Sequence, residues 1–171
     1  MKRVIAGITG LMSCLLFGLE PGVAASDAAP QLHEELRTVP ASPYDESADA
    51  QAQVAAAIAS AAAGHKFVLL EFGGNWCPDC RVTAGVLAMG EVKPWVERTF
   101  EMVPVDVGRM RKNLDIAAQY GVKITAVPTI IILDSRGRMI NTGNPAALQN
   151  ARGMSPQAIV DTIYGWISKP A

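Results

Sequence analysis

The sequence predicts an α/β domain in which helices cover both faces of a central mixed β-sheet. Three observations support this fold class. Short apolar or β-branched runs at residues 67–72, 100–107 and 129–133 alternate with longer segments of helical periodicity. Strands that are joined through helices usually lie parallel. A glycine turn at residues 134–137 leads directly into residues 138–142, which we expect to return as an antiparallel strand.

Residues 1–25 have the layout of a secretory signal peptide. A short basic start precedes an almost uncharged apolar stretch at residues 4–19, and small residues up to Ala25 allow cleavage before Ser26. The apolar stretch is short for a membrane span. We therefore expect a periplasmic or secreted protein. Two alternatives stay open, an uncleaved membrane anchor and lipid attachment at Cys14.

Residues 26–43 combine proline, alanine and polar residues without a clear period. We expect them to form a flexible leader, followed by one domain at residues 44–171. The chain of 171 residues has a formal net charge of −1. A net charge so close to zero does not suggest nucleic acid as a partner. We also expect a monomer.

The first helix and strand have clear signals. The helix, at residues 44–63, consists largely of alanine, with Asp45 or Ser47 as its N-cap and Gly64 at its end. The strand at residues 67–72 is an apolar run interrupted by one carboxylate. Such a run suits a central strand that is covered on both faces.

The remaining helices follow in order. One spans residues 77–89, residues 92–98 add a further turn or two, and residues 113–120 form a short helix before the third strand. In the last helix Ser155 is the N-cap and Pro156 is the first helical residue. Its apolar residues recur at helical spacing: Ile159, Val160, Ile163, Trp166 and Ile167.

Residues 71–81 read Glu-Phe-Gly-Gly-Asn-Trp-Cys-Pro-Asp-Cys-Arg and carry most of the candidate chemistry. Pro78 favours a helix that begins at Cys77, with Cys80 one turn further along. Free N–H groups and the helix dipole stabilise a thiolate there, so we expect Cys77 to have a lowered pKa and to be the nucleophile. Cys80 is near enough to form a disulfide with it. The pair predicts thiol–disulfide exchange.

Two other interpretations of the cysteine pair stay open. Half of a zinc site needs two further ligands, and the chain offers only two isolated histidines, His33 and His65. The other interpretation is an inert structural disulfide. Cleavage before Ser26 would remove Cys14 and leave Cys77 and Cys80 as the cysteines of the exported protein. Two cysteines three residues apart are better suited to redox chemistry than to cross-linking distant parts of the fold. We therefore expect no metal and no cofactor.

Glu71 interrupts an otherwise apolar strand. Burial of a carboxylate is costly and raises its pKa. Such a group can pass a proton to or from Cys80, directly or through water. The alternative is a bent strand edge that lets Glu71 reach solvent.

The order of elements and three separated segments resemble the thioredoxin family over about residues 44–168. Residues 72–81 are similar to the active-site segment of thioredoxins, and Glu71 stands where thioredoxins keep a buried carboxylate. The segment Thr125-Ala-Val-Pro-Thr-Ile130 looks like the cis-proline loop of that family. The nearest likeness is to exported bacterial thioredoxin-like proteins with a Trp-Cys-Pro-Asp-Cys motif.

The resemblance implies a thioredoxin fold, a catalytic set and a substrate groove. Pro128 is expected in the cis form, in a loop that packs on the disulfide and presents the Val127 backbone to an extended substrate. The residues implied for catalysis are Cys77, Cys80, Glu71 and Pro128, and those implied for substrate binding are Trp76, Pro78, Asp79 and Val127.

Two departures from the thioredoxin pattern affect the chemistry. Pro-Asp replaces the common Gly-Pro between the cysteines, so the Asp79 charge opposes a thiolate at Cys77, with Arg81 as a partial offset. The lysine that thioredoxins keep near the buried carboxylate corresponds here to Met102, which cannot pair with Glu71.

We therefore predict an exported thiol–disulfide oxidoreductase that exchanges disulfides with protein substrates. We expect it to act as a reductant that a membrane-bound redox partner recharges. One alternative is a thioredoxin-fold binding module or chaperone that holds a client or a metallochaperone without redox turnover. A thiol peroxidase is a weaker alternative, because nothing here resembles the Thr-x-x-Cys pattern of those enzymes.

Overall fold

The computed structural model describes residues 28–168, and the expected signal peptide lies outside them. The central strand β1 (Phe67–Gly73) lies between β2 (Phe100–Asp106) and β3 (Thr129–Leu133), so the strand order is β2-β1-β3. Strand β1 pairs parallel with β2 and antiparallel with β3, which makes the sheet mixed as predicted.

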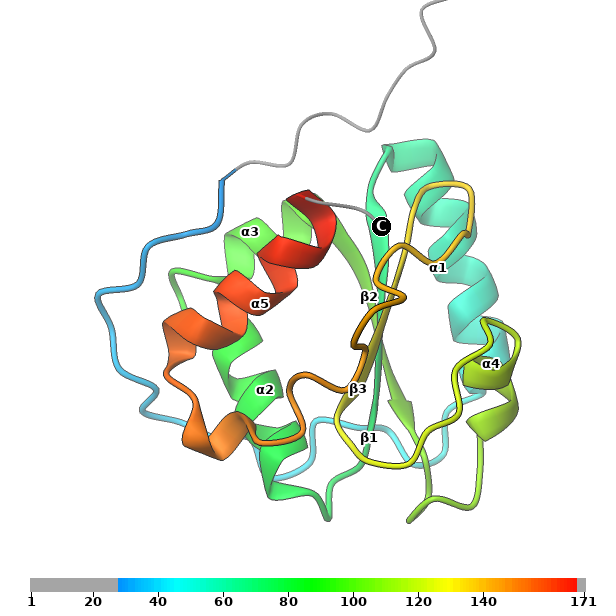
Figure 1. The fold of residues 1–171 in the computed structure, drawn as a ribbon, viewed down its shortest axis with the longest axis horizontal. Coiled ribbons are helices and arrows are strands. Elements are labelled where there is room, and N and C mark those ends of the chain that lie inside the picture. The colour runs from blue at the N-terminus through cyan, green and yellow to red at the C-terminus, as the bar shows by residue number, and fades with distance from the viewer. Residues whose placement is uncertain (1–27, 169–171) are drawn as a thin grey trace, which may run out of the picture.

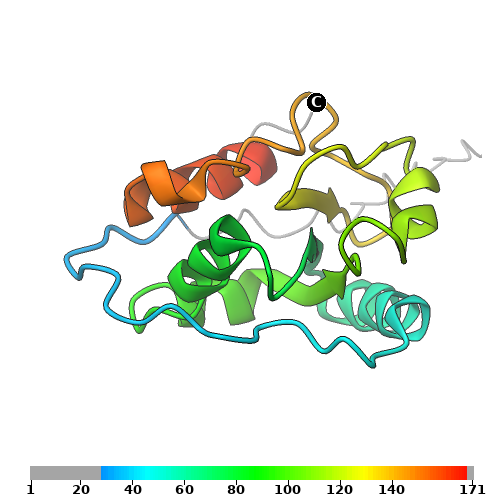
Figure 2. The ribbon, with the colours of Figure 1, turned by 90° about the horizontal axis from the view of Figure 1, so that it is seen from below.

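Helices cover both faces of this sheet (Figure 1). On one face lie α2 (Pro78–Leu87), α3 (Lys93–Thr99) and α5 (Pro156–Ser168). On the other face lie α1 (Ala50–Gly64) and the short α4 (Leu114–Ala118). The view along the sheet in Figure 2 shows the same two layers. The predicted fold class is confirmed.

Strand β1 is buried along its whole length. Because side chains alternate across a strand, Leu69 packs with α2 and α5, whereas Leu70 packs with α1 and α4. A strand that is covered on both faces favours a continuous apolar run, which is what the sequence shows.

The direction predicted for β3 from its helical connection is wrong. Thr129, at the start of β3, lies opposite Phe72, near the end of β1. Asp106, at the end of β2, lies opposite Gly73 at that same end. The intervening α4 has five residues and rises only about 7.5 Å, too little to return the chain along the sheet. Strand β3 therefore starts where β2 stops and runs the other way.

The fourth strand predicted at residues 138–142 does not form. The turn after β3 is present, with Gly137 N–H donating to Asp134 O at 2.9 Å, but only an isolated bridge joins Leu133 to Met139. Further along, the Asn141 side chain replaces backbone pairing: its Oδ1 accepts from Ile132 N at 2.8 Å, and its Nδ2 donates to Ile130 O at 2.9 Å.

The first helix begins later than predicted. Asp49 caps α1 by accepting from Ala52 N at 3.0 Å. Asp45 and Ser47, the predicted caps, instead bond to each other, with both donors on Ser47. Such local bonding holds the chain in a turn before the helix. The last helix starts as predicted, because Ser155 Oγ accepts from Ala158 N at 3.2 Å.

The described part of the leader, residues 28–43, contains no helix or strand and lies against the domain (Figures 1 and 2). Gln157 on α5 accepts from Leu32 N at 2.8 Å and donates to Pro30 O at 3.1 Å. Arg81 on α2 donates to Pro40 O at 2.8 Å. No helix within residues 28–168 is long and apolar enough to cross a membrane.

Candidate active site

A disulfide joins Cys77 and Cys80 at the N-terminus of α2, with Cα atoms 5.3 Å apart. Cys77 is the N-cap in an extended conformation, and its Sγ accepts from Cys80 N at 3.2 Å. Pro78 occupies the first turn, where no N–H donor is needed. The free N–H groups of this turn therefore face Cys77 Sγ, the atom that would carry charge as a thiolate.

The loop before β3 closes over the disulfide. The Val127–Pro128 peptide bond is cis, and Cys77 Sγ lies 3.7 Å from Val127 O. Val127 packs against the two cysteines and Tyr44. Thr129 Oγ1 donates to Ala126 O at 2.8 Å and so holds the loop. The structure thus brings Pro128 and Val127 to the cysteine pair.

The rim of the site is exposed on one side. Trp76 is 37% exposed and Pro78 is also exposed, although Cys77 between them is buried. The Arg109 guanidinium lies over the Trp76 ring, 5.6 Å from its centroid, which fits a cation–π contact. Sequence reasoning did not single out Arg109, because the contact joins two loops far apart in the chain.

Asp79 is not part of this exposed rim. Its side chain is buried and accepts from Arg152 N at 2.9 Å and from Arg152 Nε at 3.2 Å. Arg152 is therefore the cation beside Asp79, whereas Arg81, the expected offset, donates to Pro40 O in the leader. The sequence offered no signal for the pair, since the residues lie 73 positions apart.

Glu71 is fully buried, and its carboxylate oxygens make no hydrogen bond of ordinary geometry. Burial raises the pKa of Glu71 from 4.5 to about 7, and the nearby Tyr44 hydroxyl opposes part of this rise. Met102 is not the residue opposite Glu71, because Met102 pairs with Leu69 and Pro104 pairs with Glu71. Proline offers no donor or charge to the carboxylate.

Tyr44 is the functional candidate that sequence reasoning missed. The sequence predicts a helix that begins at Tyr44, yet Tyr44 lies ahead of α1 and is 3% exposed beside both cysteines. Asn75 fixes it through two hydrogen bonds of 3.0 Å, accepting from Tyr44 N and donating to Tyr44 O. A large aromatic residue at the end of a polar leader was the only hint in the sequence.

Two glycines make room for this arrangement. A Cβ atom at Gly73 would overlap the Tyr44 hydroxyl and would lie 2.8 Å from Cys80 Sγ. A Cβ atom at Gly74 would lie 2.5 Å from Trp76 Nε1. The Gly-Gly turn between β1 and α2 is therefore needed for close packing. Among residues 28–168, no group of three or more His, Cys, Asp or Glu side chains is arranged to hold a metal ion.

The class of protein follows from this geometry, because a mixed sheet that sets a helix-capping disulfide against a proline loop is built for thiol–disulfide exchange. It is a thiol–disulfide oxidoreductase of the thioredoxin fold. The chain belongs to the thioredoxin-like family, whose model matches residues 49–135.

Comparison with known proteins agrees with this assignment. A solved structure described as a disulphide isomerase from Xylella fastidiosa Temecula1 is 38% identical, with a TM-score of 0.69 over 74% of this chain and 97% of that one. A thioredoxin-like protein from Fusarium culmorum is 27% identical over 103 residues, which are 60% of this chain and 80% of that protein. A structure described as DsbH oxidoreductase shares the fold at 24% identity and a TM-score of 0.50, over 66% of this chain and 80% of that one.

Proposed function

We propose that this protein is an exported thiol–disulfide oxidoreductase that reduces disulfides in protein substrates. The observation that carries the proposal is the Cys77–Cys80 disulfide at the N-terminus of α2, with only Cys77 next to an exposed rim. In the reduced protein the Cys77 thiolate attacks a substrate disulfide, and one substrate sulfur leaves as a thiolate. The Cys80 thiolate then attacks Cys77 Sγ, which re-forms the protein disulfide and releases the second substrate thiolate.

The substrate is proposed to lie across the exposed rim. Trp76 and Pro78 flank Cys77, and the Val127 carbonyl lies 3.7 Å from Cys77 Sγ. An extended peptide can pair with the Val127 backbone as an added strand, while its disulfide approaches Cys77. Trp76 then supplies a flat apolar surface with the Arg109 charge above it. Asp79 acts differently from the other proposed contacts, since Arg152 occupies both of its oxygens.

The reducing direction rests on negative charge near the cysteines. A reduction potential rises when the reduced, thiolate form is stabilised. The helix N-terminus stabilises the Cys77 thiolate, but the Asp79 carboxylate in the same turn, although paired with Arg152, opposes it. A less stabilised thiolate corresponds to a lower potential and therefore to a reductant.

Two experiments test the activity and its direction. The purified protein, reduced beforehand, is expected to reduce the disulfides of a model protein such as insulin, and Cys77→Ser is expected to abolish this activity. Equilibration in glutathione buffers gives the potential, where a value towards about −270 mV supports a reductant and one towards about −120 mV an oxidant. A wild-type protein that binds substrate but never turns over would support the binding module instead.

Disulfide isomerisation is the second candidate function. It is favoured by the 38% identity to a structure described as a disulphide isomerase, which this chain matches over 97% of its length. An isomerase attacks a non-native disulfide and lets the substrate exchange its own disulfides before it is released. A high reduction potential of the Cys77–Cys80 pair and rapid refolding of a protein with scrambled disulfides would support this function. Reduction of substrate without any reshuffling supports the reductant.

Export and the redox partner complete the proposal. We propose cleavage after Ala25, a monomer in the periplasm, and a membrane-bound donor that returns electrons to the Cys77–Cys80 disulfide. The N-terminus of protein recovered from the periplasmic fraction, read by mass spectrometry, tests the cleavage. A mature chain that still begins at Met1, or that stays in the membrane fraction, would contradict it.

A further inference from the structure

We propose that Tyr44, which directly follows the leader, is the proton relay between Glu71 and the thiol of Cys80. This inference rests on the proposed function, because it concerns the step in which Cys80 resolves the mixed disulfide. Tyr44 lies outside the stretch 49–135 that the family model matches, so the relay is not a feature of the matched family segment.

The first argument is that the Tyr44 hydroxyl and Cys80 Sγ lie close to the same position beside Gly73. Gly73 has no side chain, and a Cβ atom built there would overlap the Tyr44 hydroxyl while lying 2.8 Å from Cys80 Sγ. The phenol oxygen and the sulfur therefore face the same gap above Gly73. Tyr44, Cys77 and Cys80 also form one buried cluster, with Val127 packed against it.

The second argument is that two buried polar groups lack ordinary partners. Neither the Tyr44 hydroxyl nor the Glu71 carboxylate makes a hydrogen bond of good geometry within residues 28–168. Unpaired buried polar groups cost free energy, and these two act on each other, because Glu71 raises the pKa of Tyr44 and the Tyr44 hydroxyl lowers the pKa of Glu71. In the reduced protein the Cys80 S–H can donate to the Tyr44 oxygen, and the Tyr44 O–H can donate to the Glu71 carboxylate.

The third argument is that the active-site segment itself holds Tyr44 in place. Asn75, two residues before Cys77, makes hydrogen bonds to both Tyr44 N and Tyr44 O. Arg81, directly after Cys80, binds Pro40 O at 2.8 Å. The chain between Pro40 and Tyr44 is thus anchored on both sides of the disulfide, and the Tyr44 ring packs in one cluster with both cysteines.

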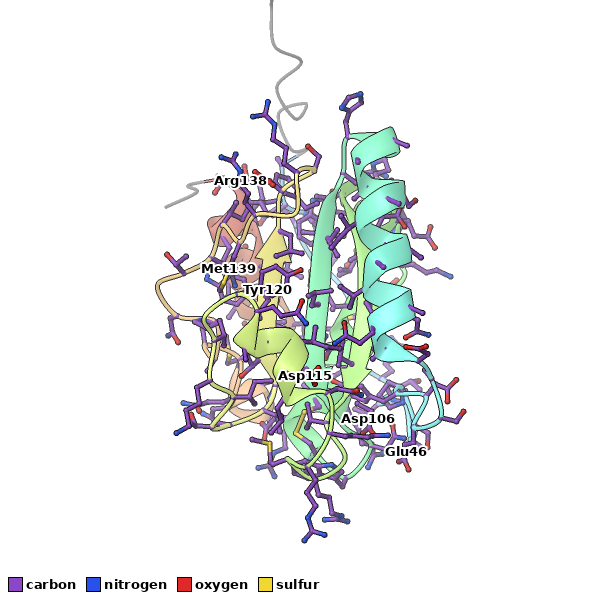
Figure 3. The ribbon with its side chains drawn as sticks, turned by 90° about the vertical axis from the view of Figure 1, so that its right-hand side faces the viewer. Glu46, Asp106, Asp115, Tyr120, Arg138 and Met139 are labelled. Atoms are coloured by element: carbon purple, nitrogen blue, oxygen red, sulfur yellow. A yellow bond between two sulfur atoms is a disulfide. The ribbon has the colours of Figure 1, made fainter. Side chains whose placement is uncertain are left out.

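The charged and titratable groups around the relay come from three elements. Glu71 lies on β1, Cys80 on α2, and Asp106 at the end of β2, where Lys112 pairs with it at 2.7 Å. Figure 3 shows Asp106 and Glu46 at this same end of the sheet. Burial, the Glu71 carboxylate and Asp106 all raise the pKa of Tyr44 above its usual range, so the phenol stays protonated.

A neutral phenol can pass a proton without keeping it. The Cys80 S–H proton moves to the Tyr44 oxygen as the Tyr44 O–H proton moves to the Glu71 carboxylate. The products are a Cys80 thiolate, a neutral Glu71 and an unchanged Tyr44, so charge and protons balance. The Cys80 thiolate then attacks Cys77 Sγ, and the substrate sulfur leaves with the electron pair.

The experiment separates the two cysteine steps with dithionitrobenzoate, a disulfide whose released thiolate is coloured. Attack by Cys77 releases the first equivalent, and attack by Cys80 releases the second. Stopped-flow traces of the reduced full-length protein are recorded from pH 5 to pH 9. Tyr44→Phe is expected to leave the first phase unchanged and to slow the second by about 100-fold, the lower end of the contribution of a general acid–base group.

Two further readouts exclude a purely structural role. Tyr44→Phe is expected to move the pH midpoint of the second phase upwards, since the hydroxyl lowers the pKa of Glu71. In a Glu71→Gln background Tyr44→Phe is expected to have no additional effect, because both residues serve one route. Tyr164→Phe, a partly buried tyrosine on α5, is the matched control.

The outcomes are distinct for the two proposals. If wild-type protein gives neither phase, the proposed oxidoreductase function fails. If both phases appear but Tyr44→Phe keeps the wild-type second phase at every pH, or adds fully to Glu71→Gln, the relay is wrong.

Discussion

Asp79 and Arg152 join the first turn of the cysteine helix to the short 3-10 helix η1 (Ala151–Gly153). The carboxylate accepts from Arg152 N at 2.9 Å and from Arg152 Nε at 3.2 Å. Asp79 is buried, whereas the Arg152 side chain is 60% exposed. The Asp79 charge near Cys77 is thus paired with a residue of η1, which contacts α2.

Removal of the Asp79 charge and removal of the Arg152 charge are expected to shift the reduction potential in opposite directions. Asp79→Asn removes a negative charge near Cys77, stabilises its thiolate and raises the potential. Arg152→Ala removes the compensating cation and lowers it, each by roughly 10–30 mV, where 30 mV corresponds to tenfold in equilibrium. Glutathione equilibration measures both. Lys93→Ala, which removes a surface cation of α3, is the control, and shifts of the same sign in the two variants would contradict the assignment.

Folding stability is expected to fall as pH rises from 4.5 to 7. Glu71 has a pKa of about 7 in the folded protein and 4.5 as its ordinary value, so in this window the folded state holds a proton that the unfolded state has lost. The contribution is fully present below pH 4.5 and is lost above pH 7. Its size is on the order of 3 kcal/mol, at about 1.4 kcal/mol per pKa unit.

Urea unfolding of the oxidised protein at several pH values measures this effect. Glu71→Gln removes the titrating group, so the difference between wild type and variant should follow the same window. Parallel stability curves for the two proteins would show that Glu71 does not titrate there. The same variant is expected to slow turnover while leaving the fold intact.

A side chain at Gly73 is expected to damage the site. Its Cβ would overlap the Tyr44 hydroxyl and crowd Cys80 Sγ, so Gly73→Ala should destabilise the fold by about 1–3 kcal/mol. Gly90→Ala is the matched control, since nothing lies within 4 Å of its added Cβ. Thermal unfolding of both variants measures the difference, and equal melting temperatures would refute the crowding.

Asn141 is expected to contribute more to folding stability than a surface asparagine does. Asn141→Ala leaves Ile132 N and Ile130 O without their side-chain partners, a loss of about 1–3 kcal/mol for a buried unsatisfied group. Chemical denaturation tests this, with the exposed Asn144→Ala as the comparison. If the two variants unfold at the same denaturant concentration, water replaces the Asn141 amide without cost.

The parts of the fold that depend on local pattern could be predicted from the sequence. Strand β3 matches its predicted range of 129–133, and Cys77 caps its helix, because apolar runs and the Cys-Pro pair act over a few residues. The burial of Glu71 also followed from its apolar neighbours.

The parts that depend on distant contacts could not be predicted. The direction of β3 depends on how far α4 can carry the chain, and no local signal reports that distance. The position of Tyr44 depends on hydrogen bonds to Asn75, 31 positions away. The fourth strand failed for a related reason: the Asn141 amide satisfies the β3 backbone that a strand would otherwise have paired.

The outer side of β3 has a consequence for self-association. Its Ile130 N–H donates to Pro145 O at 2.7 Å, its Ile132 N–H is bound by Asn141, and its Ile132 carbonyl accepts from Ile140 N at 2.9 Å. An open sheet edge would invite a second molecule to add its own strand and seed aggregates. Here the irregular chain that follows β3 occupies those groups, so a second copy of the protein finds no free edge along β3.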